Sequence, residues 1–378
     1  MNVAVLGVGQ VAFTGPSNTP MGDLAGGAAR AALADANIAA SAIQMAAVGS
    51  VYEHPSVGQR VLLRLGLNGI PLANLENACA SGTSAAIEAM RWIQSGEADV
   101  ALVVGVDKMA SYFSSGPIAL VDETDIFGAQ GLTVPAYFGL IAELHMAEFG
   151  STREDFARIS HKNRGYAAHN PYARFQSAPS FEEILASPII ASPIGKFDCC
   201  ANGDGAAALV LASESYAMRH GGSRAVWIRT AELGGGVLGD RLFDDPMTGL
   251  AKKAYERAGL GPQDIQVVEC HDNFSVGEFE AYERMGFCAH GEAHLYLRAG
   301  KSQIGGKGAA FNPSGGLLGR SHPAGATGCV QIASIVQQLR GEAGTLQHPG
   351  AKAGLVQTSG GGVMELQSNA TTVMILTV

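Results

Sequence analysis

Short apolar runs alternate along the chain with longer segments in which small and apolar residues recur at helical spacing. The runs with the length of buried strands are 3–6, 99–106, 225–230 and 353–362. Two segments rich in alanine and glycine, 80–96 and 324–341, have the period of a helix. This alternation predicts an α/β fold, with a mostly parallel sheet in each half and helices on the faces of the sheet.

The chain repeats part of its own sequence at an offset of 222 positions. The matching residues are Ala29, Ala32, Ala36, Ile38, Ile43 and Gln44, and in the second copy Ala251, Ala254, Ala258, Leu260, Ile265 and Gln266. In both copies a helix rich in alanine ends, a short loop follows and a strand begins. Chance similarity of two such helices is the alternative, but the shared order of elements favours a duplicated fold.

Residues 110–195 interrupt the repeat. They are richer in aromatic and basic residues and in Pro, Ser and Asn, as in the stretch HKNRGYAAHNPYARF. We expect an inserted loop domain there. The predicted organisation is therefore an N-terminal half at 1–222, which contains the insertion, and a C-terminal half at 223–378.

Composition narrows the class of protein. Hydrophobic residues make up 47% of the 378 residues and charged residues 16%, which excludes intrinsic disorder. A formal net charge of −9 argues against nucleic acid as the main partner. No run reaches the roughly 18 apolar residues of a membrane span. Six cysteines without a CxxC pair predict neither a disulfide framework nor a metal site, so a reducing cytoplasm is the expected compartment.

Three residues are the candidates for chemistry. Cys79 precedes a predicted helix, where the helix dipole and free backbone N–H groups are expected to lower the pKa of its thiol. His322 stands at the equivalent helix start of the other half, within GGLLGRSHPAG, and can serve as its base. His271 follows a predicted strand, in CHDNF, where functional groups of parallel sheets gather. Each taken alone is more often a structural residue, but their equivalent placement favours one catalytic site.

Five motifs together resemble the thiolase superfamily, along essentially the whole chain and in order. They are ENACASGTSAA, FDCCANGDGAAALVL, VECHDNFSVGE, NPSGGLLGRSHPAGATG and SGGG. The HDxF form of the third motif is most similar to the sterol-carrier-protein-2 type of thiolase. The resemblance implies a duplicated five-layer α-β-α-β-α fold, a homodimer or homotetramer, and an acyl-coenzyme A substrate with no permanently bound cofactor.

The resemblance also implies roles for individual residues. Cys79 matches the acylated nucleophile, His322 the residue that activates it, and His271 a residue that holds the thioester oxygen. The N–H groups of Cys79 and Gly360 match a second oxyanion hole. The positions that match coenzyme A contacts are Tyr137, Phe138, Cys200 and Phe274. By charge alone, the candidates for its phosphates are Lys162, Arg164 and Arg174.

The sequence departs from this family in its acid/base residue. Thiolases carry a second cysteine in a CxGGG motif, where this chain has Thr358, or in HDCF, where it has Asn273. Neither side chain can move a substrate α-proton efficiently, and Asn312 is a further polar candidate for an altered or supporting role. We therefore expect impaired thiolysis and Claisen condensation. Decarboxylating condensation, which needs no such base, and acyl transfer without carbon–carbon chemistry both stay open.

Two other classes of protein compete with an acyltransferase. Gly7-Val8-Gly9-Gln10-Val11-Ala12 fits a dinucleotide-binding fingerprint, but the Pro-containing stretch that follows is a poor helix start. A catalytically weak subunit that binds acyl-CoA or supports a partner protein is the second alternative. The presence of Cys79, His271 and His322 together argues against a pure scaffold. An accessory protein stays open in either case.

Overall fold

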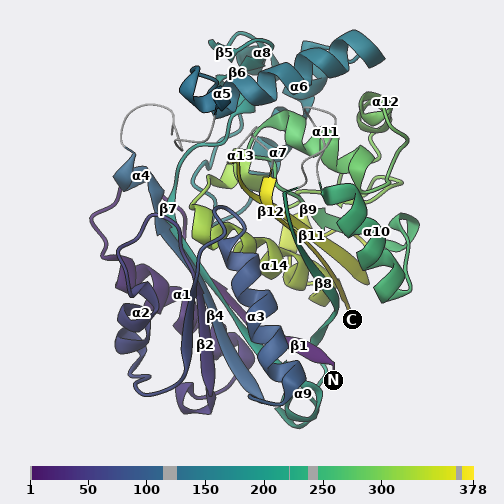
Figure 1. Ribbon diagram of the computed structural model, residues 1–378. Coiled ribbons are helices and arrows are strands. Elements are labelled where there is room, and N and C mark those ends of the chain that lie inside the picture. Colours follow the sequence, from purple (N-terminus) through teal and green to yellow (C-terminus); the bar gives the residue numbers. More distant parts are fainter. Residues whose placement is uncertain (1, 114–125, 221, 237–245, 363–367) are drawn as a thin grey trace.

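The computed structural model describes residues 2–113, 126–220, 222–236, 246–362 and 368–378 (Figure 1). Ten strands form one sheet in the described residues, in the order β10-β9-β11-β12-β8-β1-β7-β4-β2-β3. The strands of the first half are β1 (Val3–Gln10), β2 (Met45–Gly49), β3 (Leu72–Leu75), β4 (Val100–Lys108) and β7 (Asp204–Ser213). Those of the second half are β8 (Val226–Gly235), β9 (Val267–Glu269), β10 (Ala310–Phe311), β11 (Ala353–Gly362) and β12 (Ser368–Thr377).

The two halves have the same strand order and the same directions. In the first half β3, β2 and β4 are parallel neighbours, whereas β4, β7 and β1 are antiparallel neighbours. In the second half β10, β9 and β11 are parallel, and β11, β12 and β8 are antiparallel. A short antiparallel pairing of β1 with β8 joins the halves. The predicted duplication is confirmed. The prediction of mostly parallel sheets is wrong, because two of the four strand pairings in each half are antiparallel.

The helices complete five layers. On the outside of the first half lie α1 (Met21–Ala36) and α2 (Val57–Leu65), and on the outside of the second lie α10 (Met247–Ala258) and α11 (Ser275–Arg284). Between the two halves lie α3 (Ser81–Ser95) and α14 (Ala324–Arg340), which pack against each other. Three buried apolar clusters fill the spaces between these layers. The predicted α-β-α-β-α architecture is confirmed.

The repeated residues mark equivalent elements. The short 3-10 helices η1 (Ala40–Ala42) and η3 (Pro262–Asp264) follow α1 and α10, and each precedes a parallel strand, β2 or β9. The offset of 222 positions therefore holds through a helix, a loop turn and a strand. The sequence repeat therefore reflects a duplicated structural unit and not a chance similarity of two helices.

The glycines of the dinucleotide-like fingerprint lie inside a strand. Gly7 and Gly9 belong to β1, and a Cβ built on Gly9 would lie 2.3 Å from the Ala28 carbonyl oxygen of α1. These glycines therefore allow α1 to pack directly on the sheet. The helix begins only at Met21, so no helix N-terminus is available next to the glycines for a pyrophosphate.

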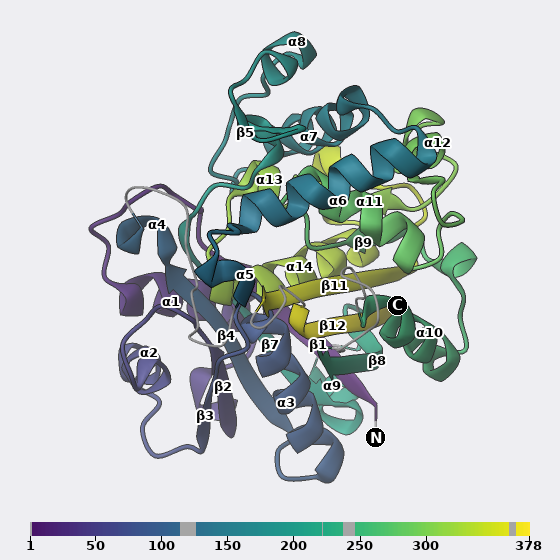
Figure 2. The same cartoon turned by 45° about the horizontal axis from the view of Figure 1, so that its top comes forward.

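The insertion is more helical than predicted. Its described elements are α4 (Met109–Tyr112), α5 (Ile126–Ala129), α6 (Val134–Phe149), α7 (Arg153–Ala167), α8 (Phe181–Leu185), β5 (Ile189–Ala191) and β6 (Ile194–Gly195), and η2 (Lys196–Asp198) follows directly after it. Residues 114–125 of the predicted insertion lie outside the described residues. Helices α6 and α7 both pack on α11 of the C-terminal half, and Figure 2 shows α6 passing in front of α11.

Three further helices connect these parts: α9 (Glu214–His220), α12 (Ala293–Arg298) and α13 (Gly316–Arg320), with a last 3-10 turn at η4 (Gly344–Leu346). Packing of α13 against α7 ties the insertion to the segment that carries His322. Among the described residues, no helix combines the length and apolar character that crossing a membrane requires.

Candidate active site

Cys79 lies in a tight connection between β3 and α3. Ala78 adopts a φ of +47°, a conformation that L-residues rarely adopt. The turn is fixed by Ser81, whose hydroxyl donates to the Ala78 carbonyl at 2.6 Å and accepts the Asn77 N–H at 2.9 Å. The sequence correctly placed this cysteine just before a helix, and the turn presents its sulfur to a cavity.

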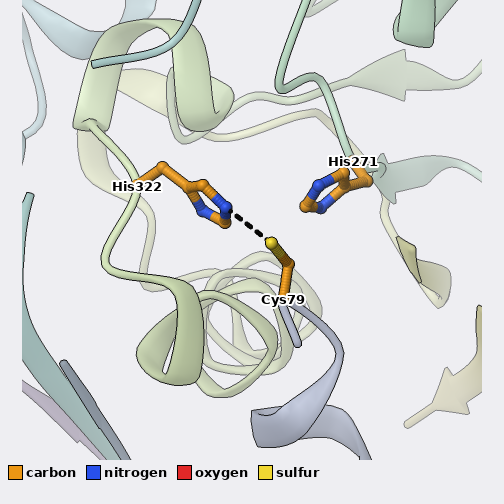
Figure 3. Close-up of side chains that lie close together, drawn as sticks. All are labelled: Cys79, His271 and His322. Atoms are coloured by element: carbon orange, nitrogen blue, oxygen red, sulfur yellow. Dashed lines mark hydrogen bonds between the residues drawn. The ribbon is translucent and has the colours of Figure 1, made fainter. Parts of the chain in front are cut away.

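His322 has a single tautomer that the hydrogen bonds define. Its Nδ1 lies 2.7 Å from Oγ1 of Thr327, and that hydroxyl itself donates to the Pro323 carbonyl at 3.0 Å. The hydroxyl therefore accepts the proton on Nδ1, which leaves Nε2 as a bare acceptor. Nε2 lies 3.0 Å from the Cys79 sulfur (Figure 3). The geometry is that of a nucleophile and its general base.

Burial keeps both members of this pair neutral. Burial raises the pKa of the Cys79 thiol to about 12, and the nearby Asp107 carboxylate acts in the same direction. Burial lowers the pKa of His322 to about 3. The expectation of a lowered cysteine pKa is wrong, because loss of water around the sulfur outweighs the helix N-terminus.

The neutral pair predicts a nucleophilic reactivity of Cys79 toward thioesters that is nearly independent of pH. The thiol passes its proton to His322 within the pair, and the neutral forms dominate between a His322 pKa of about 3 and a Cys79 pKa of about 12. A free thiol with a pKa near 8.5 instead gains about tenfold in rate per pH unit below that value. We expect less than about twofold change between pH 6 and 9, measured as single-turnover acylation by intact mass. A rise with a midpoint near pH 8 contradicts this assignment.

His271 completes the cluster. One ring nitrogen of each histidine and the Cys79 sulfur lie within 4.8 Å of one another, and the two imidazole centroids are 5.3 Å apart. The His271 backbone N–H donates to Oε1 of Gln357 at 3.0 Å, which fixes the loop after β9. Burial lowers its pKa well below the usual range, and its buried Nδ1 has no protein partner in the described residues. The neutral ring lines the cavity next to the Cys79 sulfur, where it can face a polar substrate atom.

The same three side chains offer donor atoms that a transition metal accepts. Thiolate and imidazole are the ligands of many zinc sites. Here, however, the thiol of Cys79 is protonated and donates to His322, so two of the three donor atoms are already paired with each other. A metal would have to displace that proton. The arrangement is therefore better matched to nucleophilic chemistry.

The backbone donor at the sulfur is Gly361. Its N–H donates to the Cys79 sulfur and lowers the pKa of the thiol, against the effect of burial. Gly361 has a φ of +67°, which glycine adopts without strain. Gly360, the predicted donor, pairs with Ala370 in the sheet, and its α-carbon packs against the Asn77 carbonyl. Sequence alone gave no means of telling the two neighbouring glycines apart.

The three polar candidates for an altered acid/base role lie in different surroundings. Asn273 lines the cavity, and its Oδ1 accepts the Phe274 N–H at 3.1 Å. Thr358 is fully buried and its hydroxyl donates to Oε1 of Gln331 at 2.6 Å. Asn312 is also fully buried and bonds the Cys270 sulfur at 3.2 Å, away from the cavity lining. Neither Thr358 nor Asn312 reaches the space in front of Cys79.

The cavity has a volume of about 1370 Å³ and carries aromatic and basic groups. It contains all four predicted coenzyme A contacts, Tyr137, Phe138, Cys200 and Phe274. The Phe138 and Phe274 rings stack with centroids 4.5 Å apart. Lys196, which the sequence did not single out, also lines the cavity.

The three basic residues predicted as phosphate ligands lie in different surroundings. Arg164 lines the cavity, with its guanidinium 4.7 Å from the Phe175 ring and 4.9 Å from the Phe197 ring. Lys162 lies outside this cavity's lining, and its buried ammonium pairs with Glu278 at 3.0 Å. Two positions along a helix differ by about 200°, so Lys162 and Arg164 occupy opposite faces of α7. Arg174 donates to the Asn202 carbonyl at 2.7 Å.

The fold is a duplicated α/β fold whose site pairs a partly buried nucleophilic thiol with a histidine, and comparisons with known proteins give its family. The family model described as thiolase, N-terminal domain matches residues 7–215, and the model described as thiolase C-terminal domain-like matches residues 241–376. The chain therefore belongs to the thiolase family, and it is an acyltransferase of the thiolase type.

Individual relatives cover most of the chain. Sterol carrier protein 2 of Bos taurus is 38% identical over 385 residues, covering 95% of this chain and 70% of its own length. Benzoylsuccinyl-CoA thiolase subunit BbsB of Thauera aromatica is 35% identical over 367 residues, covering 95% of each chain. The solved structure described as Ltp2-ChsH2(DUF35) aldolase has a TM-score of 0.86 at 26% identity, covering 100% of this chain and 98% of that one.

Proposed function

We propose that the protein transfers an acyl group from a coenzyme A thioester through an acyl-enzyme on Cys79. The thiol gives its proton to Nε2 of His322 as the sulfur attacks the thioester carbonyl. The tetrahedral intermediate collapses, the proton on His322 passes to the departing coenzyme A sulfur, and the acyl group stays on Cys79. The single observation that carries this proposal is the 3.0 Å contact between the Cys79 sulfur and Nε2 of His322. That nitrogen is an acceptor because the proton of the imidazole is on Nδ1.

Donors around the sulfur fit the charge that develops during the attack. The Gly361 N–H already points at the Cys79 sulfur, and the N–H of Cys79 itself also lowers the thiol pKa. We assign these two N–H groups to the developing oxyanion, in place of the expected pair with Gly360. His271, which lines the cavity beside Cys79, is assigned to the thioester oxygen of a second bound acyl-CoA.

The coenzyme A moiety is assigned to the basic side of the cavity. The guanidinium of Arg164 packs against two phenylalanine rings, which fix its plane. Among the described residues, no carboxylate lies at hydrogen-bond distance from it, because the acidic groups nearby pair with Arg153 and Lys162. Such a cation can bind phosphate groups in two-point contacts. Lys196 on the same lining adds a second positive charge. The sequence-based assignment of Tyr137, Phe138, Cys200 and Phe274 to this ligand remains part of the proposal.

Intact mass after mixing with an acyl-CoA tests the acyl-enzyme. We expect one acyl group per chain in the wild type and none in Cys79→Ala, because the sulfur is the nucleophile. Cys288→Ala, which removes a thiol outside the cavity lining, is the matched control and should keep the adduct. Binding of acyl-CoA without any adduct at several chain lengths refutes the enzyme and favours the alternative of an acyl-CoA-binding subunit.

Carbon–carbon chemistry needs a proton donor or base beyond this pair, since Asn273 and Thr358 occupy the two positions where related enzymes have a cysteine. We propose that thiolysis or Claisen condensation is slower than acyl transfer for this reason. Of the similar proteins, BbsB is described as a subunit of its thiolase, and the description of the solved aldolase structure names two proteins, Ltp2 and ChsH2. Both descriptions support an accessory protein for this chain too. A homodimer or homotetramer and a cytoplasmic location remain predictions.

A further inference from the structure

Cys79 and His322 each stand two residues before a long helix, in different halves of the chain. Helix α3 begins at Ser81 and helix α14 begins at Ala324. The 3.0 Å contact between the two side chains therefore depends on how the starts of these helices lie against each other. A group that fixes one helix start relative to the other also fixes the nucleophile relative to its base.

Glycines line the place where the two helix starts meet. A Cβ built on Gly82 of α3 would lie 2.6 Å from the carbonyl oxygen of Gly325, in the first turn of α14. One built on Gly325 would lie 2.7 Å from the carbonyl oxygen of Gly49, the last residue of β2. Backbone thus meets backbone with no side chain between. Such contacts prevent a closer approach, but they do not stop α14 from moving away, so an attractive contact is also needed.

Asp107 makes that contact. It is fully buried near the end of β4, in the first half of the chain. Its Oδ2 accepts the backbone N–H of Gly325 at 2.5 Å, a donor of the first turn of α14 that has no partner within the helix. Its Oδ1 accepts the Tyr52 N–H at 3.0 Å and the Ser50 hydroxyl at 3.1 Å, in the loop after β2. The carboxylate therefore joins the first half directly to the helix that follows His322.

The ring of His322 follows the position of α14, whereas its backbone does not. The His322 N–H donates to the Ala201 carbonyl at 2.8 Å, and the His322 carbonyl accepts the Gly203 N–H at 3.2 Å. Nδ1 of the ring, however, bonds to Thr327, which belongs to α14. A shift of α14 would therefore leave the backbone of His322 in place and turn its ring away from the Cys79 sulfur.

We propose that Asp107 is a positioning residue for the catalytic pair. Its carboxylate holds the start of α14 against the first half, and this keeps Nε2 of His322 within reach of the Cys79 proton. Asp107 lies outside the cavity lining, so it acts through the helix and not on the substrate. This role rests on the acyl-enzyme proposed above.

The charge of Asp107 suits this position. Burial raises the pKa of its carboxyl to about 6, and the hydrogen bonds from Tyr52 and Gly325 act in the opposite direction. The group is therefore ionised above pH 7, as is favourable at a helix start. Its charge also raises the pKa of the Cys79 thiol, but burial is the larger cause. Removing the charge therefore leaves Cys79 as a thiol that still needs a base.

Asp107→Asn provides the test. Its amide oxygen can keep the bonds to Tyr52 and Ser50, but the NH₂ group then faces the Gly325 N–H, and two donors cannot bond. Without its base, Cys79 reacts only as the thiolate. We expect its reactivity to fall about 100-fold at pH 7 and to rise about tenfold per pH unit between pH 7 and 9. The wild type should stay within about twofold over that range, measured as alkylation of Cys79 by iodoacetamide and as acylation by acetyl-CoA, both by mass.

Two more variants make the result specific. Ser50→Ala removes a partner of the same carboxylate but leaves the Gly325 bond, so it should keep the flat pH profile. Asp107→Ser has a side chain too short to reach Gly325, and we expect the same steep profile as in Asp107→Asn. A flat profile at a lower rate in the Asp107 variants would indicate a loss of folded protein and overturns the proposal. A steep profile in Ser50→Ala overturns it as well.

Iodoacetamide needs no acyl-CoA, so the same experiment separates this role from the acyl-enzyme. If acetyl-CoA leaves no adduct on the wild type but alkylation becomes steep in the Asp107 variants alone, the acyl-enzyme is refuted and the positioning role is supported. If acetyl-CoA acylates the wild type and Asp107→Asn with the same flat profile, the acyl-enzyme is supported and the positioning role is refuted.

Discussion

His322→Ala is expected to slow acylation of Cys79 on the order of 10³-fold, in the middle of the range for loss of a general base. The thiol has a pKa of about 12, so without an acceptor it is almost entirely protonated at neutral pH. Among the described residues its sulfur then has no hydrogen-bonded side-chain acceptor for the proton, and the nearby His271 ring is not bonded to it. Rapid-quench intact mass, which follows the acyl adduct over time, measures the effect directly.

Two further variants make the result specific. Thr327→Val removes the hydroxyl that accepts the Nδ1 proton and should cost about tenfold, because the tautomer is no longer fixed. His290→Ala removes an exposed histidine bound to Glu283 and should have no effect. Equal rates in His322→Ala and wild type would show that the proton leaves Cys79 by another route.

Gly328→Ala is expected to lower the free energy of unfolding by about 3 kcal/mol, the upper end for overpacking. A Cβ at this position would lie 2.4 Å from the Thr83 backbone nitrogen, where α14 crosses α3. Backbone cannot move aside as a flexible side chain can, so the two helices must separate. Urea unfolding, with activity measured in parallel, gives both consequences.

Gly165→Ala is the control for helix propensity. Gly165 lies within α7 and a Cβ there would meet nothing within 4 Å, so the substitution should be neutral or add up to about 1 kcal/mol. If Gly328→Ala is as stable as Gly165→Ala, the close crossing of α3 and α14 is not required. A stable Gly328→Ala with slow acylation would instead show that the crossing positions the catalytic pair.

The order of elements could be predicted because it depends on local pattern. The match of Ala29 and its neighbours with Ala251 and its neighbours identified two equivalent helices, and the apolar run at 353–362 coincides with β11. Strand direction could not be predicted in this way. Whether β7 runs parallel or antiparallel to β4 depends on the path of the insertion between them, and an apolar run reads the same in both directions.

The predicted insertion reads as loops because part of it is rich in Pro, Ser and Asn. Its two long helices leave no clear pattern in the sequence, for separate reasons. Helix α6 is apolar on most of its surface, which hides the helical period, and α7 is largely polar although nine of its residues are buried. Buried polar contacts such as Lys162 with Glu278 depend on tertiary structure and leave no periodic signal.

At the site, the sequence predicts which three side chains come together but not their electrostatics. Cys79, His271 and His322 come together, since each follows a strand or precedes a helix at the same edge. The sign of the Cys79 pKa shift could not be predicted, because it depends on how much water the insertion excludes. The choice between Gly360 and Gly361 depends on a single φ angle, which residue type does not determine where two glycines are adjacent.

Cys79 and His322 come from different halves and are 243 positions apart in the chain. During synthesis the thiol therefore leaves the ribosome long before its base exists. Over that interval Cys79 has no proton acceptor of its own, so a nascent or truncated chain cannot be acylated by the route proposed for the folded protein. Competence for catalysis by that route therefore requires both halves of the chain, with α14 packed against α3.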